Sequence, residues 1–315
     1  MKLIVVGAGN IAIEYIKVLY ALGIEPVVVG RGKKNINKIK EKFQGIIAFS
    51  GGIKKYLETN EPSEYSIVAT DLKNLSKTVK VLIHNNVKNI LVEKPLSVSI
   101  DEVKELVKLS LIKNVKISIA FNRRAYQSVI HSKEIIEKDG GVKSFHFDFS
   151  EAIYRQSKSD LDKYSKNNLK YWGICNSSHV IDTVFYLCGN VKEINCFQYG
   201  SDINWHKNGS KFIGNGLTVN NIPFSYNSDW TCPGRWNITI NTTNHKLIFS
   251  PMEKLNIQNK ESFKINEVKL DYNIDLKFKA GFYIQCKKFI NSEPLFNMEE
   301  LENRILLFNQ IFNYK

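Results

Sequence analysis

The sequence has few cysteines and no long apolar run. Its 315 residues include five cysteines, an odd number, and none of them stand in a CxxC spacing. This pattern excludes a disulfide framework and a zinc motif, and it indicates reduced thiols that serve mostly in packing. No apolar stretch has the length of a membrane span, and the N-terminus lacks the basic and then apolar layout of a signal peptide. We therefore expect a cytoplasmic protein without a metal centre.

A concentrated basic segment is also missing, although the net charge is +13 at pH 7. The lysines and arginines are spread along the chain, whereas a nucleic-acid-binding protein usually gathers them in one arm or stripe. The dispersal therefore disfavours RNA and DNA as partners. An anionic small molecule is the partner that this charge favours.

The first twenty residues contain a strand, a glycine turn and a helix in that order. The apolar run MKLIVV precedes Gly7-Ala8-Gly9-Asn10-Ile11, and an amphipathic segment follows. This order is the context that a dinucleotide fingerprint requires. Gly7 permits the sharp turn, Gly9 lets the backbone approach a pyrophosphate, and the amides that follow face the phosphate charge. The alternative is a packing turn that binds nothing.

No acidic residue stands at the end of the second predicted strand, residues 26–29. An acid there would bind the ribose 2′-hydroxyl of NAD and repel the 2′-phosphate of NADP. The chain has Gly30, Arg31 and Lys33 instead, and a guanidinium binds phosphate well. We therefore predict NADP in preference to NAD. The alternative is that these cations form a solvated surface.

Short apolar strands alternate with helices up to about residue 120. Strands are predicted at 45–50, 65–70, 89–92 and 115–120, with helices at 53–58, 75–85 and 101–111. Ser99 and Glu102 form a candidate capping box at the start of the last helix. The alternation predicts a doubly wound parallel sheet, a Rossmann domain over residues 1–120. Residues at its strand ends, Thr70, Asp71, Leu72 and Glu93, are candidate cofactor contacts.

Beyond residue 121 the pattern changes to many strands separated by turns. Strands are predicted at 142–149, 191–199, 211–218, 222–225, 236–241, 245–250 and 255–259, and helices at 126–138, 178–187 and 298–312. This pattern indicates a large, mainly antiparallel open sheet in a second α/β domain, residues 121–315. We expect the last helix to be able to pack back on the first domain.

Two stretches carry candidate chemistry. Lys94 follows the strand 89–92, and ligands of open α/β sheets bind at the carboxyl ends of strands. A lysine there is suited to donate and accept a proton. His179 and Asp182 are three residues apart on a helix that begins at Ser177 or Ser178, so they share a face near its N-terminus. Histidine titrates near neutral pH, and an aspartate beside it can orient it. The alternatives are an exposed lysine before a turn proline and a core histidine.

Together these motifs resemble the Gfo/Idh/MocA oxidoreductases. The GAGNIA turn, the VEKP strand end, the FNRR segment at residues 121–124 and the SHVID helix carry the resemblance. It implies a Rossmann domain followed by an α/β domain whose sheet forms dimer or tetramer contacts. It also implies that Lys94 and His179 share proton transfer with a substrate hydroxyl or carbonyl, and that Asp182 belongs to the same site. The substrate contacts that it implies are Asn122, Arg123, Tyr154, Arg155, Trp172 and Asn176.

The chain departs from the family pattern in two places. Many members carry an acid three or four residues before the histidine, where this chain has Cys175 and Asn176. Asn176 can bond to a sugar hydroxyl but cannot act as a base. Members also often have a proline-containing segment that ends in histidine after the fourth strand, and residues 70–75 lack it here.

The sequence therefore predicts an NADP-dependent oxidoreductase that moves hydride between the nicotinamide and a hydroxyl or carbonyl carbon. The substrate is expected to be sugar-like and anionic, either phosphorylated or linked to a nucleotide. The assembly is expected to be a homodimer or homotetramer. Two alternatives remain open: a dehydratase or epimerase that retains its cofactor, and a non-catalytic NADP sensor.

Overall fold

The computed structural model describes residues 1–314, and the chain divides into two compact units. The N-terminal unit contains Met1–Asn122 together with Asn273–Asn303, and the C-terminal unit contains Arg123–Tyr272 together with residues 304–314. After Tyr272 the chain returns to the N-terminal unit for residues Asn273–Asn303, which the sequence-based division at residues 120 and 121 does not include in that unit.

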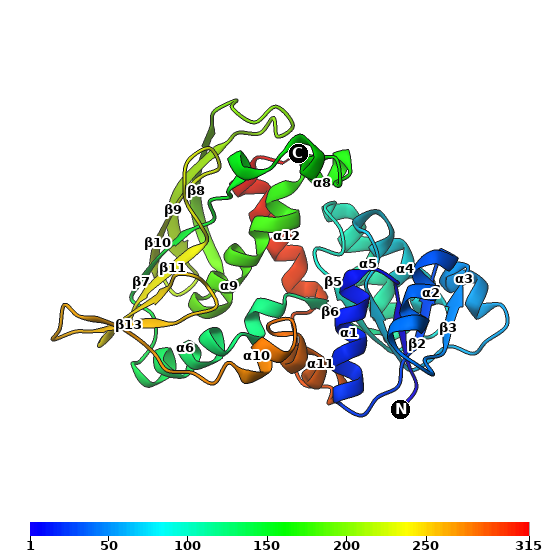
Figure 1. The fold of residues 1–315 in the computed structure, drawn as a ribbon. Coiled ribbons are helices and arrows are strands. Elements are labelled where there is room, and N and C mark those ends of the chain that lie inside the picture. The colour runs from blue at the N-terminus through cyan, green and yellow to red at the C-terminus, as the bar shows by residue number, and fades with distance from the viewer. Residues whose placement is uncertain (315) are drawn as a thin grey trace. The chain divides into compact units, whose positions relative to one another are not determined.

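The N-terminal unit contains a parallel sheet of six strands in the order β3-β2-β1-β4-β5-β6 (Figure 1). The strands are β1 Leu3–Val6, β2 Val27–Gly30, β3 Ala48–Ser50, β4 Tyr65–Val68, β5 Asn89–Glu93 and β6 Lys116–Ala120. Most of their apolar residues are buried, as expected for a sheet covered on both faces. This is the predicted doubly wound sheet, and its strand order reverses between β1 and β4.

Seven helices accompany this sheet among the described residues: α1 Asn10–Ala21, α2 Lys33–Lys42, α3 Gly52–Leu57, α4 Leu72–His84, α5 Ile100–Lys113, α10 Asn273–Lys277 and α11 Phe282–Ile290. Helices α2, α10 and α11 were not predicted from the sequence. Lysine-rich α2 buries only Ile36 and Ile39. Helix α11 packs against α1, where the rings of Tyr15 and Phe282 lie 4.7 Å apart.

The start of α5 differs from the predicted capping box. The Ser99 side chain accepts from the Glu102 amide, as a helix cap does. However, the Glu102 carboxylate accepts from the Ser76 hydroxyl at 2.6 Å and the Ser97 hydroxyl at 2.5 Å. It therefore connects α5 to α4 and does not return to the Ser99 amide.

The C-terminal unit contains a sheet of eight strands in the order β14-β13-β12-β11-β7-β10-β9-β8. The strands are β7 Ser144–Asp148, β8 Val191–Tyr199, β9 Lys211–Thr218, β10 Pro223–Asp229, β11 Asn237–Asn241, β12 His245–Phe249, β13 Asn256–Asn259 and β14 Ile265–Glu267. Only the β7–β10 pair is parallel. The mainly antiparallel sheet is therefore confirmed, and the short exposed β14 is an addition to the prediction.

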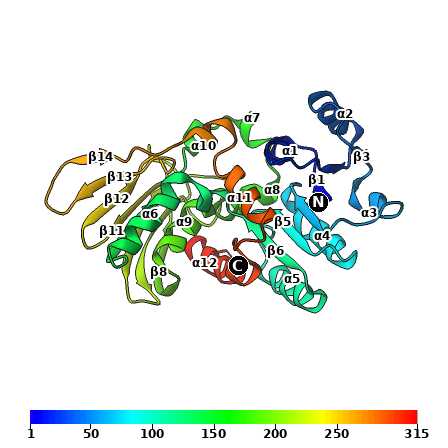
Figure 2. The ribbon, with the colours of Figure 1, turned by 90° about the horizontal axis from the view of Figure 1, so that it is seen from below.

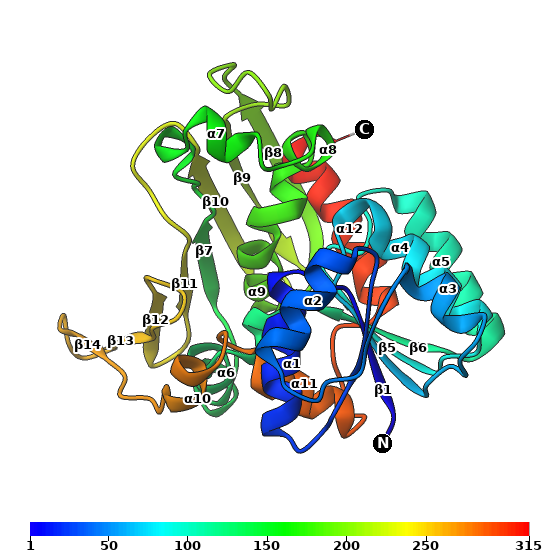
Figure 3. The same ribbon diagram turned by 45° about the vertical axis from the view of Figure 1, so that its right-hand side comes forward.

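Helices cover one face of this sheet. Helix α6, Gln127–Lys138, lies beside α9, Ser178–Cys188 (Figure 2). Helix α12, Met298–Phe312, is drawn in red in Figure 3, and the ring of its last residue, Phe312, packs on Phe149 and Phe212. Helix α12 crosses the boundary between the units, which lies after Asn303. None of the helices described is long and apolar enough to cross a membrane.

Shorter turns complete the C-terminal unit. They are η1 Asn122–Ala125, which begins at the boundary, η2 Ile153–Arg155, α7 Lys158–Leu161, α8 Lys166–Lys170 and the π-helical η3 Gly173–Ser177. The last of these leads directly into α9. π-helical turns occur frequently at functional sites.

Candidate functional site

A cavity of about 700 Å³ opens at the carboxyl ends of β1, β2 and β4 in the N-terminal unit. This is the switch point at which open α/β sheets bind their ligands. The cavity is lined by six residues that the sequence predicted as cofactor contacts, namely Gly7, Gly9, Gly30, Arg31, Thr70 and Asp71. The predicted turn and the predicted strand ends thus meet at one place.

The glycines of the turn have different physical roles. Gly7 has a φ of +138°, and a Cβ there would lie 2.2 Å from the carbonyl oxygen of Ala69. Gly9 is the N-cap of α1 and makes no side-chain capping bond, and the space within 4 Å of a Cβ on Gly9 is empty. The first amides of α1 therefore adjoin open space, beside a turn in which Gly7 leaves no room for a side chain. This cradle fits the pyrophosphate of a dinucleotide.

Five predicted cofactor contacts do not line the cavity: Asn10, Ile11, Lys33, Leu72 and Glu93. Other residues line it that the sequence analysis missed, including Gly32, Asn35, Gly51, Gly52, Lys54, Asn74, Lys77 and Thr78. The Gly51-Gly52 pair could have been found from the sequence, since two consecutive glycines after a strand indicate a turn. Their φ values are +108° and +85°.

An acidic side chain, that of Asp71, lies beside Arg31 in the structure. The Arg31 Nη2 atom is 3.1 Å from the Asp71 Oδ1 atom, and the Asn74 amide nitrogen donates to the same oxygen at 2.6 Å. The end of β2 lacks an acid as predicted, but the sheet brings Asp71 across from the end of β4. Both side chains of the ion pair are largely exposed, so the pair contributes little stability and exchanges easily with a competing anion.

Glu93 and Lys94 stand together at the end of β5 but have different surroundings. The Glu93 carboxylate accepts from the Tyr15 hydroxyl at 2.6 Å, and the Gln285 amide donates to that hydroxyl at 3.3 Å. Burial raises the pKa of Glu93, against the opposing effects of the Tyr15 hydrogen bond and of the Lys94 charge. The Glu93 side chain therefore faces α1 and α11. The half-buried Lys94 is the first residue of the loop between β5 and α5.

His179 is not near a free helix end. Residues of η3 continue into α9, and Ser177 has helical backbone angles. The α-helix itself begins at Ser178, as predicted, and the π-helical turn precedes it directly. The His179 side chain is nearly buried, and its ring centroid lies 6.0 Å from that of Trp236.

Asp182 has partners other than the expected one. Its buried carboxylate accepts from Arg124 Nε at 2.8 Å and Arg124 Nη2 at 2.7 Å, and Arg304 Nε lies 3.3 Å from its Oδ1 atom. Its hydrogen bonds therefore go to arginines and not to His179. This arrangement connects η1, α9 and the middle of α12 through one carboxylate.

Glu151, which the sequence analysis missed, lies beside Asn176. Its buried carboxylate accepts from the Asn176 amide at 2.8 Å, the Ser177 hydroxyl at 2.7 Å and the Trp236 indole at 3.3 Å. The Arg123 guanidinium lies 4.9 Å from the centroid of the Trp236 ring. No local motif marks Glu151, since its partners are distant in the sequence.

The remaining predicted substrate residues lie in varied environments. Asn122 is buried and its amide donates to the Ala280 carbonyl at 2.8 Å, so it holds a loop of its own unit. Trp172 is buried between the rings of Tyr164 and Trp205. Tyr154 and Arg155 are exposed on η2. Asn122 and Trp172 thus have evident packing roles.

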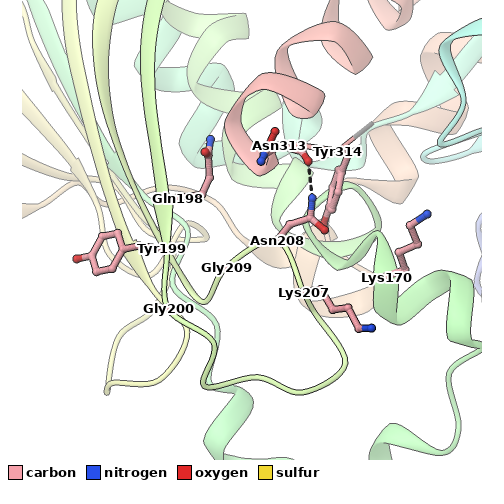
Figure 4. A pocket seen from close by; sticks show the side chains of 9 residues that line it. All are labelled: Lys170, Gln198, Tyr199, Gly200, Lys207, Asn208, Gly209, Asn313 and Tyr314. Atoms are coloured by element: carbon pink, nitrogen blue, oxygen red, sulfur yellow. Dashed lines mark hydrogen bonds between the residues drawn. The ribbon is translucent and has the colours of Figure 1, made fainter.

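A second cavity of about 520 Å³ lies in the C-terminal unit, beside the end of α12 (Figure 4). The Asn208 amide donates to the Asn313 carbonyl, and Gln198 donates to carbonyls of Gln310 and Ile311. Its two lysines, Lys170 and Lys207, are exposed. Tyr314 lines this cavity and accepts from the Gly173 amide at the start of η3.

Taken together, the sheet order and the glycine cradle define the class of nucleotide-binding Rossmann proteins. The first 121 residues match the model of the Gfo/Idh/MocA family, described as an oxidoreductase family with an NAD-binding Rossmann fold. This match over residues 1–121 agrees with the resemblance predicted from the motifs. No curated protein matches its sequence.

Solved structures share the fold of the whole chain. One is levoglucosan dehydrogenase in complex with NADH and levoglucosan, with a TM-score of 0.81 at 14% identity, covering 99% of this chain and 96% of the other. Another is described as an NADPH-dependent oxidoreductase from Desulfitobacterium hafniense, with a TM-score of 0.80, 16% identity and coverages of 99% and 95%. A third is UDP-N-acetylglucosamine 3-dehydrogenase from Acidithiobacillus ferrooxidans, with a TM-score of 0.75, 12% identity and coverages of 99% and 97%.

Proposed function

We propose that the protein is an NADP-dependent oxidoreductase that transfers hydride between the nicotinamide and a hydroxyl or carbonyl carbon of a sugar-like substrate. The glycine-lined cavity beside β1 and β4 is the observation that carries this proposal, because it fits a dinucleotide. The bound nicotinamide supplies the hydride chemistry, and the protein supplies binding, orientation and proton management.

The preference for NADP rests on Arg31. Its guanidinium lines the cavity where the adenosine ribose binds in folds of this type. In this structure the guanidinium forms an ion pair with Asp71, but an exposed pair of this kind contributes only about 0–1 kcal/mol to stability. A doubly charged 2′-phosphate is therefore expected to displace Asp71 from Arg31. Lys54 and Lys77 add positive charge to the same cavity.

Lys94 and His179 are proposed as the acid and base that exchange a proton with the substrate oxygen. Lys94 stands at the end of a parallel strand, and His179 is held in a buried helix. Asp182 contributes by fixing Arg124, from which it accepts hydrogen bonds, and Arg304, with which it forms an ion pair. We thus assign Asp182 a positioning role in place of direct proton transfer.

The sugar-like substrate is supported by the relatives, which are named for levoglucosan and UDP-N-acetylglucosamine. The surplus of positive charge favours a phosphorylated or nucleotide-linked sugar. Arg123 and the exposed Arg155 are the candidate contacts for that anionic group. We expect the protein to act in the cytoplasm.

Two measurements test this proposal. Fluorescence titration with NADPH and NADH compares the two cofactors, and tighter binding of NADH would refute the role of Arg31. Turnover is then followed by NADPH absorbance with a panel of neutral sugars, polyols, sugar phosphates and nucleotide sugars. Cofactor that copurifies and does not exchange would instead indicate a dehydratase or epimerase, and binding without any turnover would indicate a sensor.

We also propose that the outer face of the large sheet forms a homo-oligomer contact. Phe197 and Ile213 are cross-strand neighbours on β8 and β9, and both are exposed together with Tyr199. Exposed apolar groups of this kind mark interaction surfaces. Light scattering coupled to gel filtration tests this, because Phe197→Glu should dissociate the assembly, and a monomeric wild-type protein would contradict it.

A further inference from the structure

Glu151 follows the central strand β7 and is fixed by the backbone around it. The Asp148 carboxylate accepts from the Ser150 amide at 2.6 Å, and the Ser150 hydroxyl accepts from the Asp229 amide at 2.9 Å. The exit of β7 is thereby tied to the end of β10, its parallel neighbour. The backbone that carries Glu151 is therefore held in place just beyond the C-terminal end of β7.

Three neutral donors converge on the Glu151 carboxylate. Ser177 Oγ and Trp236 Nε1 donate to its Oε1 atom, and Asn176 Nδ2 donates to its Oε2 atom. An ionised carboxylate only accepts hydrogen bonds, so this set of donors matches the charged form. Asn176 and Ser177 belong to η3, which leads into the helix of His179. The carboxylate is thus held directly beside the segment that carries the predicted base.

We propose that Glu151 is the acidic residue of the substrate site and binds a hydroxyl group of a polyhydroxylated substrate. The inference rests on the proposed function. Many members of the family carry an acid at the positions of Cys175 or Asn176, and this chain has none there. Glu151 supplies a carboxylate beside that position. A carboxylate absent from the helix is thus supplied by the end of β7, through tertiary structure.

The neighbouring side chains fit the same ligand chemistry. Trp236 is half-buried, lies against the Arg123 guanidinium, and approaches the His179 ring. Because the Asn176 amide nitrogen donates to Glu151, the amide oxygen of Asn176 is left to accept from another donor. Carboxylate, amide and aromatic ring together recognise a sugar ring by its hydroxyl groups. Any phosphate of the substrate must lie away from Glu151, since two like charges repel.

The test compares Glu151→Gln and Glu151→Asp with the wild type and with Glu137→Gln, an exposed control on α6. Turnover is measured with the sugar of the panel that the wild type oxidises, and then with its monodeoxyfluoro analogues, whose fluorine cannot donate. Loss of a hydrogen bond to a charged group is expected to raise KM about tenfold or more in Glu151→Gln. NADPH affinity should stay unchanged in every variant.

The analogues separate a substrate contact from a structural role. In the wild type, one analogue should raise KM about tenfold, and in Glu151→Gln that same analogue should add no further increase. Equal losses with that analogue in both proteins, or a Glu151→Gln variant with the wild-type KM, would overturn the assignment. If Glu151→Gln does not fold, Glu151→Asp carries the same comparison, because it keeps the charge but shortens the reach. If the wild type oxidises no sugar of the panel, the proposed function fails first, and this inference fails with it.

Discussion

The two candidate binding regions are built in opposite ways. The cavity of the N-terminal unit has six glycines among its lining residues, together with the exposed pair Arg31 and Asp71. The region around His179 in the C-terminal unit is built from buried side chains, in which Glu151 and Asp182 each gather several donors. A backbone cradle binds what every dinucleotide shares, whereas a side-chain network can be specific to one substrate.

Replacing Lys94 by Ala should separate the two kinds of binding most strongly. If Lys94 exchanges the proton, turnover should fall by about 10²–10⁴-fold, as for other general acid–base groups. NADPH affinity should be almost unchanged, because the glycine cradle remains intact. Steady-state kinetics and fluorescence titration measure both quantities. Wild-type turnover in this variant would remove Lys94 from the mechanism.

Replacing Asp182 by Asn tests the side-chain network through stability. The change leaves two buried guanidinium groups without their carboxylate, and breaking a buried pair costs roughly 3–5 kcal/mol. Denaturant unfolding of the whole chain should show this loss. The control is Asp160→Asn, which removes an exposed pair with Lys163 and should change the midpoint very little. Equal effects of the two variants would contradict the structural role of Asp182.

Arg31→Ala should weaken NADPH binding by about tenfold, since a charge-assisted contact to phosphate is lost. NADH binding should hardly change. Asp71→Asn should act in the opposite direction, because it frees Arg31 from its present partner, and NADPH should bind a few-fold tighter. An Arg31→Ala variant that weakens both cofactors equally would show that Arg31 does not select between them.

The smallest expected effect concerns pH and His206. Burial lowers the pKa of His206, whose Nε2 atom lies 2.7 Å from the Tyr314 hydroxyl and whose Nδ1 atom lies 2.8 Å from the Gly209 carbonyl. The folded state thus binds fewer protons than the unfolded state below about pH 6.5. Stability should be complete above that pH and should decline as the pH falls toward the lowered pKa.

Thermal unfolding between pH 7.5 and 5.5 measures this decline. A His206→Gln variant should be less stable at neutral pH but should lose less on acidification. His131→Gln, at a half-exposed position, serves as the matched control and should follow the wild type. A wild-type midpoint that is constant over this range would refute the contribution of His206.

Hydrophobic periodicity predicted most of the fold, but it did not predict helices that are short or strongly charged. Helix α2 buries only Ile36 and Ile39 among many lysines, so its amphipathic signal was weak. Helix α11 was missed because its pattern over Phe282–Ile290 is short. Its return to the N-terminal unit depends on a packing contact with α1 that no local pattern records.

The candidate site divides in the same manner. Gly7, Gly9 and Arg31 could be predicted, because each follows directly from a strand, a turn and a helix in series. Glu151 could not, since its partners Asn176 and Trp236 are 25 and 85 residues away. Asp182 was predicted to lie in the site, but its partners were not, because Arg124 and Arg304 come from two other elements.

The sequence by itself determined the alternation of strands and helices, the glycine turn and the positions of Lys94 and His179. These features depend on local backbone geometry and on hydrophobic periodicity, which neighbouring residues encode. Only the tertiary structure decided that Asp71 meets Arg31, that Asp182 holds two arginines, and that Glu151 lies beside Asn176. Buried polar groups must find hydrogen-bond partners wherever the fold provides them, and for these residues the partners are distant in the chain.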